Sequence, residues 1–195
     1  MQPLSTIDLA ASLDRRKRYF STATRWMGWR NRSRIRNRLP QKPNGLWYAF
    51  GGAWLEWCED ESYSYGGLLY EVELDDSRIY RLRGNKAKVE AFTEKYLNHP
   101  YVEMFGAAER AVGGSADARR FQRRLGLPDW ERLAEKYDGF EVNPYGEHRL
   151  DTCLWYYSWD VPSGCLWNKR SLLSVSLFAT QGEEGEWNLC ERQTL

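Results

Sequence analysis

The alternation of hydrophobic and polar residues predicts a β-rich centre for this chain. It is clearest in residues 67–74, where Leu69, Glu71 and Glu73 alternate with Tyr70, Val72 and Leu74 after a glycine pair. Short apolar or β-branched runs bounded by Gly, Pro or Asp predict further strands in five segments: 46–50, 77–82, 140–142, 151–161 and 164–178.

A period near 3.6 predicts helices around these strands. Val89, Phe92 and Tyr96 share one face of a helix over residues 85–98, and Asp129 is placed to cap a second helix that ends near residue 136. Residues 53–61 fit one or two helical turns with Trp54, Trp57 and Cys58 on one side, and residues 1–14 fit a short helix with Ser5 as its cap. The Ala/Gly/Arg-rich segment 106–126 is predicted to be a surface insertion. The expected fold class is therefore α+β.

The charge distribution divides the chain into two parts. Residues 15–38 hold nine Arg and one Lys without an acid, whereas residues 39–195 hold 18 basic and 25 acidic residues, although the whole chain of 195 residues has a net charge of only +1. We expect a basic N-terminal arm, residues 1–38, on a single domain formed by residues 39–195.

The basic arm has several interpretations. Its ten cations are interleaved with Tyr19, Phe20, Trp26 and Trp29, a combination that suits phosphate contacts and base stacking. Docking to an acidic protein and a merely solvated tail are the alternatives. An organellar presequence would also be rich in Arg, but Asp8 and Asp14 count against it.

Composition argues against a membrane protein, a secreted protein and a metal-binding protein. No apolar run reaches the length of a membrane span and no secretory signal is present, so we expect an intracellular, cytoplasmic protein without membrane contact. Four dispersed cysteines without a C-x-x-C pair, and only two histidines, predict reduced and mostly buried thiols and no metal site.

The segment 42–60, KPNGLWYAFGGAWLEWCED, concentrates three Trp, one Tyr and one Phe beside three Gly. These rings could simply fill a core. They could equally form a slot for a flat ligand, in which glycine lets ligand atoms approach the backbone and Lys42 supplies a positive charge for a phosphate.

The order of motifs resembles the ADP-ribosyltransferase fold, a split mixed β-sheet with peripheral helices, and especially its poly-ADP-ribose-polymerase-like branch and its phage and bacterial toxin relatives. The segments that carry the resemblance are GLWYA (45–49), GLLYEVEL (67–74), YDGFEV (137–142) and WDVPSGCLWN (159–168) within residues 35–175. It implies a transferase that uses NAD as a substrate, with Gly45, Trp47, Tyr48, Trp54 and Ser163 around the nicotinamide.

The resemblance also implies two kinds of charged residue. An Arg on the first strand would hold the ribose or phosphate of NAD, and Arg34, Arg36 and Arg38 precede the KPNGLW segment. A carboxylate would stabilise the oxocarbenium-like transition state, as in glycoside hydrolysis.

The late segment 163–167 contains no acid, so that carboxylate must lie elsewhere. Asp160 and Glu141 are the leading candidates, and Glu71 and Glu73 are the outsiders.

These observations predict an NAD-dependent ADP-ribosyltransferase-like protein that modifies a nucleic acid or a protein. The prediction requires an open cleft between the strands that begin at Leu46 and Leu68. The alternatives are a non-catalytic nucleic-acid-binding module that uses the basic arm and a Trp-rich face, and a structural or interaction protein in which the pocket serves only for packing.

Overall fold

The computed structural model describes residues 3–28, 41–97, 126–146 and 152–194. These ranges form a mixed α+β structure, so the predicted fold class is confirmed. The strands are β1 (Arg18–Thr22), β2 (Leu46–Phe50), β3 (Leu68–Leu74), β4 (Ile79–Leu82), β5 (Gly139–Val142), β6 (Ser163–Leu166), β7 (Leu172–Gln181) and β8 (Trp187–Thr194). The helices are α1 (Thr6–Ser12), α2 (Ala53–Asp60), α3 (Lys86–Lys95), α6 (Trp130–Ala134) and α7 (Leu154–Tyr157), with 3-10 turns η1 (Asp76–Arg78) and η3 (Lys169–Ser171).

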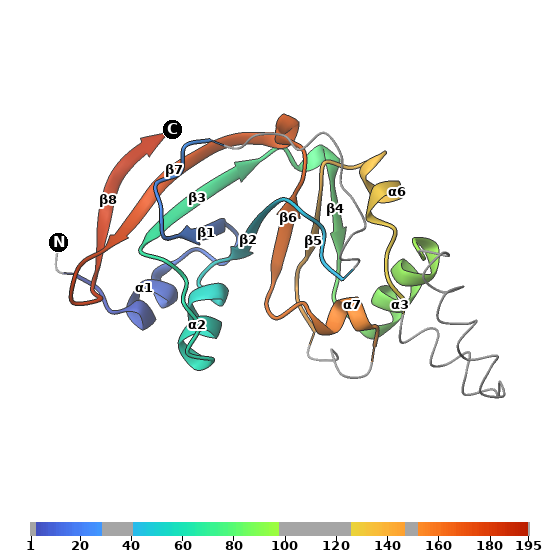
Figure 1. Ribbon diagram of the computed structural model, residues 1–195, viewed down its shortest axis with the longest axis horizontal. Helices are drawn as coiled ribbons and strands as arrows, with labels where there is room; N and C mark the ends of the chain where they lie inside the picture. Colours follow the sequence, from blue (N-terminus) through green and yellow to red (C-terminus); the bar gives the residue numbers. More distant parts are fainter. Residues whose placement is uncertain (1–2, 29–40, 98–125, 147–151, 195) are drawn as a thin grey trace.

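Within the described ranges the strands form one eight-stranded sheet in the order β4-β5-β6-β2-β1-β3-β7-β8. Only the β4–β5 pair is parallel. In Figure 1 the strands β3 and β7 run obliquely across the view, whereas β4, β5 and β6 run steeply down it. The sheet therefore turns strongly between its two halves, and β1 and β2 lie at the turn.

Strand β1 corrects the expected boundary between arm and body. It lies at the centre of the sheet, antiparallel to both β2 and β3, and Arg18, Tyr19 and Phe20 are buried. Residues 18–22 therefore belong to the sheet and not to a basic arm. The segment RYFST has the aromatic and β-branched content of a strand, which the surrounding arginines concealed.

Most helix predictions are confirmed at their capping residues. The side chains of Ser5, Asn85 and Asp129 accept hydrogen bonds from backbone N–H groups in the first turns of α1, α3 and α6. Helix α2 also forms as predicted, but the three residues expected on one of its sides are not equally buried. Trp54 and Trp57 stack on each other at 5.0 Å and stay half-buried, whereas Cys58 is buried.

Two predictions near the C-terminus are wrong. Residues 151–161 were expected as a strand, but their described part contains the short helix α7. Trp155 donates a hydrogen bond to Thr93 Oγ1 and Tyr156 donates one to the Gly84 carbonyl, so contacts with distant residues stabilise this turn. The segment 164–178 is not one strand but β6, a 3-10 turn and β7, and β8 was not predicted at all.

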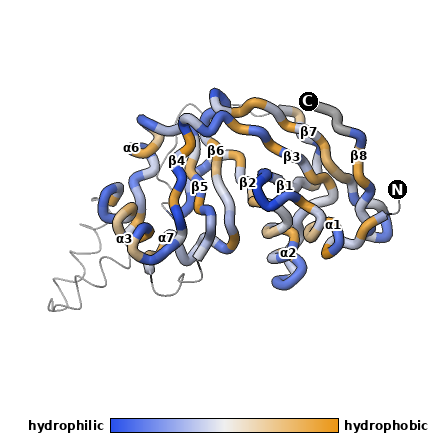
Figure 2. Tube along the Cα trace, turned by 180° about the vertical axis from the view of Figure 1, so that it is seen from behind, coloured by the Kyte–Doolittle hydropathy of each residue, from blue (hydrophilic) through white to orange (hydrophobic). Residues whose placement is uncertain are grey.

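The core of the described residues consists of three apolar clusters. One lies between the β4–β6 part of the sheet and helices α3, α6 and α7, a second lies on the opposite face, and a third joins α1 and α2 to β1, β3 and β8. In Figure 2 hydrophobic residues follow the sheet strands, while the far end of α2 is hydrophilic. Trp130, Trp155, Trp159 and Trp187 are fully buried, so much of the tryptophan content is core rather than an exposed stacking face.

Candidate functional site

A cavity of about 320 Å³ lies where β1 and β2 separate. The two strands pair only at Arg18 with Phe50 and at Tyr19 with Ala49. Continued antiparallel pairing would place Phe20 opposite Tyr48 and Ser21 opposite Trp47, but these four residues line the cavity instead. The other lining residues are Tyr19, Lys42, Ala49, Trp54, Trp159, Asp160, Val161 and Ser163.

This geometry revises the expected position of the cleft. The sequence predicts a cleft between the strands that begin at Leu46 and Leu68, which are β2 and β3. Strand β1 lies between those two strands, and the opening is between β1 and β2. The predicted residues Lys42, Trp47, Tyr48, Trp54, Asp160 and Ser163 are nevertheless brought together around it.

Aromatic rings form much of the cavity wall. The rings of Trp47 and Trp159 are 4.7 Å apart and tilted by 58°. Trp47 is half-buried, and its indole N–H donates to the Pro43 carbonyl at 3.2 Å. Trp47 is thus held in place without being sealed in the core, and its ring is available to a flat ligand.

Two buried polar atoms of the lining have no hydrogen-bond partner in the part of the chain that the structure describes. They are Ser21 Oγ on β1 and Trp159 Nε1. A buried hydroxyl or indole N–H without a partner costs about 1–3 kcal/mol, so such groups are rare unless a ligand or water satisfies them. Both atoms lie beneath the cavity surface, so a ligand reaches them only when the wall shifts locally.

An ion pair completes the polar side of the cavity. Lys42 Nζ lies 3.5 Å from Asp160 Oδ2, and it also lies 5.4 Å from the centroid of the Trp47 ring. The side chains of Lys42 and Asp160 are 42% and 23% exposed, respectively. Both charges therefore remain accessible to a ligand, and the 3.5 Å separation makes this a weak pair that a bound anion or cation could replace.

Gly45 and Ser163 support the cavity. A side chain on Gly45 would overlap the Leu166 carbonyl and lie 2.7 Å from Cys165 Sγ, so this glycine permits close contact between the start of β2 and β6. Gly45 is not part of the lining, and its role here is packing. Ser163 does line the cavity, and its hydroxyl donates to the Val161 carbonyl at 2.9 Å, which fixes the segment that carries Asp160.

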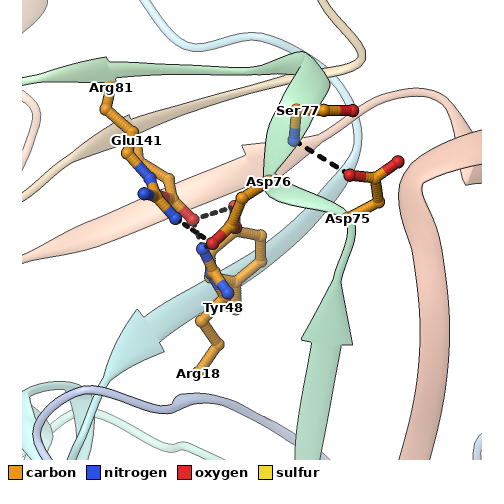
Figure 3. Close-up of polar contacts among 7 residues, drawn as sticks. All are labelled: Arg18, Tyr48, Asp75, Asp76, Ser77, Arg81 and Glu141. Atoms are coloured by element: carbon orange, nitrogen blue, oxygen red, sulfur yellow. Dashed lines mark hydrogen bonds and ion pairs between the residues drawn. The ribbon is translucent and has the colours of Figure 1, made fainter.

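Glu141 lies in a buried ionic cluster outside the cavity lining (Figure 3). Its Oε1 accepts hydrogen bonds from Arg18 Nε at 2.5 Å and from the Tyr48 hydroxyl at 2.9 Å, and its Oε2 accepts one from Arg81 Nε at 3.2 Å. The side chain is 1% exposed. Both carboxylate oxygens are occupied, so the geometry assigns Glu141 to the interior of the fold and leaves Asp160 as the carboxylate of the cavity.

Contacts within this cluster shift the pKa values of Arg18 and Tyr48. Burial lowers the pKa of Arg18, but the hydrogen bond and charge of Glu141 outweigh burial and raise it above its ordinary value. Burial, reinforced by the Glu141 charge, raises the pKa of Tyr48 well above its ordinary value. Asp76 also pairs with Arg18 and with Arg81. Arg18 therefore stays charged, and Tyr48 stays a neutral hydrogen-bond donor.

The other candidate residues lie elsewhere. Glu71 accepts hydrogen bonds from Lys17 Nζ and Glu73 accepts one from Ser174, and neither lines the cavity. Arg36, like Arg34 and Arg38, falls outside the described residues.

Sequence reasoning missed Tyr19, Phe20, Ser21 and Trp159 as lining residues. The strand-like composition of 18–22 was the available signal for the first three.

No protein-family model, curated protein or solved structure shows significant similarity to the chain. In the described ranges no helix has the length and apolar character needed to cross a membrane. The same ranges contain no group of three or more His, Cys, Asp or Glu side chains placed to hold a metal ion.

Proposed function

We propose that the cavity between β1 and β2 binds the nicotinamide end of NAD, and that the protein is an ADP-ribosyltransferase-like enzyme that modifies a macromolecule inside the cell. The observation that carries the proposal is a ring-walled cavity that contains the half-buried Trp47 and the accessible Asp160, with two unpartnered polar atoms, Ser21 Oγ and Trp159 Nε1, beneath its wall.

The chemistry of nicotinamide matches this lining. Its flat ring suits the half-buried ring of Trp47, and its carboxamide offers one acceptor and two donors. After a local shift of the wall, the Trp159 N–H would donate to the carboxamide oxygen, and Ser21 Oγ would accept from the carboxamide nitrogen. A volume of about 320 Å³ is at the small end of ligand pockets, so the diphosphate and adenosine would lie outside, within reach of Lys42.

Asp160 would act on the sugar. In the proposed reaction the bond between nicotinamide and ribose C1′ breaks, both electrons of that bond leave with nicotinamide, and positive charge develops at C1′. The Asp160 carboxylate stabilises that charge, and a nucleophile of the acceptor then bonds to C1′ and loses its proton. In the proposed complex Lys42 turns from Asp160 to the diphosphate.

The fold is compatible with this assignment. The two glycine-led segments of the family resemblance correspond to β2 and β3, and the sheet that contains them is mixed. Segment 163–167 forms β6 beside β2 and carries no acid. Asp160 precedes this strand and lines the same cavity, which supports its role as the substitute carboxylate.

A thermal-shift titration with NAD and with nicotinamide tests the binding step. A ligand at 100 times its dissociation constant stabilises the folded state by about 2.7 kcal/mol, which corresponds to a rise in Tm of roughly 5–10 °C for a chain of this size. Absence of any shift with either ligand, for protein that unfolds cooperatively, would contradict the proposal.

Ser21→Ala sharpens this test, because Ser21 Oγ has no partner to lose. We expect an unchanged or slightly higher Tm without ligand and a clearly smaller shift with nicotinamide. Ser174→Ala, outside the cavity, should keep the full shift.

Asp160→Asn should keep the nicotinamide shift but abolish release of nicotinamide from NAD. If Asp160→Asn retains full turnover, the catalytic role of Asp160 is wrong.

A further inference from the structure

A second hollow, of about 430 Å³, lies between strand β4 and helix α3. Strand β4 ends the strand order, so among the described elements one of its edges has no strand partner. Figure 1 shows α3 next to β4 at the end of the sheet remote from β8. The rings of Tyr80 on β4 and Phe92 on α3 meet at 5.3 Å and close the floor of the hollow.

Two rows of positive charge flank this hollow. Arg81 and Arg83 come from β4 and the residue after its end, and Lys88 and Lys95 come from α3. All four are exposed, and no acidic side chain of the described chain lines the hollow. Arg81 is partly neutralised by Asp76 and Glu141, whereas Arg83, Lys88 and Lys95 form no ion pair with any described residue. The excess charge is therefore available to an anionic ligand.

The spacing of the cations favours an extended ligand. Lys88 and Lys95 are separated by seven residues, or about 10.5 Å along a helix, and Arg81 and Arg83 by two residues, or about 6.6 Å along a strand. These separations distribute the charge along the groove instead of focusing it on one point. A chain of phosphates fits two such rows better than a single phosphate does.

We propose that the groove between β4 and α3 binds the phosphodiester backbone of single-stranded nucleic acid. Arg83, Lys88 and Lys95 contact the phosphates, and the half-buried Tyr80 ring on the floor contacts a sugar or base. Arginine forks and lysine ammonium groups are the usual partners of phosphate oxygens. An acidic peptide added as a strand fits less well, because β4 has only four residues and offers few main-chain groups for pairing.

The test measures polarisation of a labelled single-stranded oligonucleotide of about twelve nucleotides, a length within the range that single-strand-binding folds cover. Affinity of the full-length chain is recorded against salt concentration for wild type and for Arg83→Gln, Lys88→Gln and Lys95→Gln. All three side chains are exposed, so each variant should fold. Each groove substitution should weaken binding several-fold at low salt and reduce the slope of log affinity against log salt by about 0.7.

Lys86→Gln is the matched control. Lys86 lies on the same helix, is exposed and carries the same charge, but it does not line the groove. Other basic segments of the chain add to total binding, so the comparison between Lys86→Gln and Lys88→Gln is decisive. Equal effects of these two substitutions, or unchanged salt slopes in all groove variants, would overturn the proposal.

Competitors distinguish the ligand class. A hairpin duplex, inorganic polyphosphate and a polyglutamate peptide should each displace the oligonucleotide less effectively than an unlabelled single strand at equal charge. Equal or better displacement by any of them would reject single-stranded nucleic acid as the occupant.

The groove is independent of the nicotinamide cavity. The thermal shift of Lys88→Gln with NAD should match that of wild type whether or not the groove binds nucleic acid.

Discussion

Replacing Glu141 with Gln should cost the protein about 3 kcal/mol of stability without removing its ligand response. The substitution keeps the shape of the side chain and removes its charge. Arg18, whose side chain is only 10% exposed, then loses its buried counter-ion. The Tyr48 hydroxyl and Arg81 lose a charged acceptor as well.

The structure sets the size of this effect. Breaking a buried ion pair by removing one partner costs about 3–5 kcal/mol. Arg18 keeps a second carboxylate, since its Nη2 lies 2.6 Å from Asp76 Oδ1, and Asp76 is 46% exposed. We therefore expect the low end of the range, which corresponds to a fall in Tm of roughly 6–12 °C for a chain of this length.

Urea unfolding measures the change as a lower midpoint at an unchanged m-value. Glu73→Gln is the matched control, because Glu73 is exposed on β3, and it should shift stability by no more than about 0.5 kcal/mol. A loss below about 1 kcal/mol for Glu141→Gln would refute the buried-cluster argument. Loss of the nicotinamide shift in a folded Glu141→Gln protein would show that Glu141 takes part in ligand binding after all.

Three further predictions concern other parts of the fold. Burial acts to raise the pKa of Asp138, but hydrogen bonds from Arg170 and Ser171 and the charge of Arg78 outweigh it and hold the pKa below its ordinary value of 3.8. This stabilisation is present above pH 3.8 and is lost as pH falls through the lower folded-state pKa. In urea titrations from pH 5 to pH 2, the unfolding free energy of Asp138→Asn should therefore fall less than that of wild type. Gly45→Ala should cost about 1–3 kcal/mol in the same assay because of overlap with β6, whereas Gly67→Ala, whose nearest contact would be 3.5 Å away, should be nearly neutral. Burial raises the pKa values of Cys153 and Cys165, and it raises that of Cys58 to about 11. Thiol labelling of the native protein at pH 8, read by peptide mass mapping, should therefore modify the partly exposed Cys190 first. Faster labelling of a buried thiol would contradict this.

Local sequence signals fixed most of the regular elements. The caps at Ser5 and Asp129 predicted α1 and α6, the helical spacing of residues 89, 92 and 96 predicted α3, and the alternation in 68–74 predicted β3. These signals act within a few residues of each other. Dispersed cysteines without a paired motif predicted free thiols, and the four are unpaired.

Local sequence signals could not predict the long-range contacts. Residues 151–161 have strand-like composition, yet the described part turns into α7, where Trp155 meets Thr93 and Tyr156 meets Gly84. The two acidic candidates could not be separated by composition either. Only the packing showed that Glu141 is enclosed by Arg18, while Asp160 faces the cavity.

Local sequence patterns predicted most of the helices, several strands, the ring-rich segment after Lys42 and six of the residues that line the cavity. Tertiary structure alone decided that β1 enters the centre of the sheet and that its early separation from β2 opens the cavity. The physical reason is that strand pairing joins segments distant in the chain. Local composition therefore reports a strand's propensity but not its partner, nor the point at which the pairing ends.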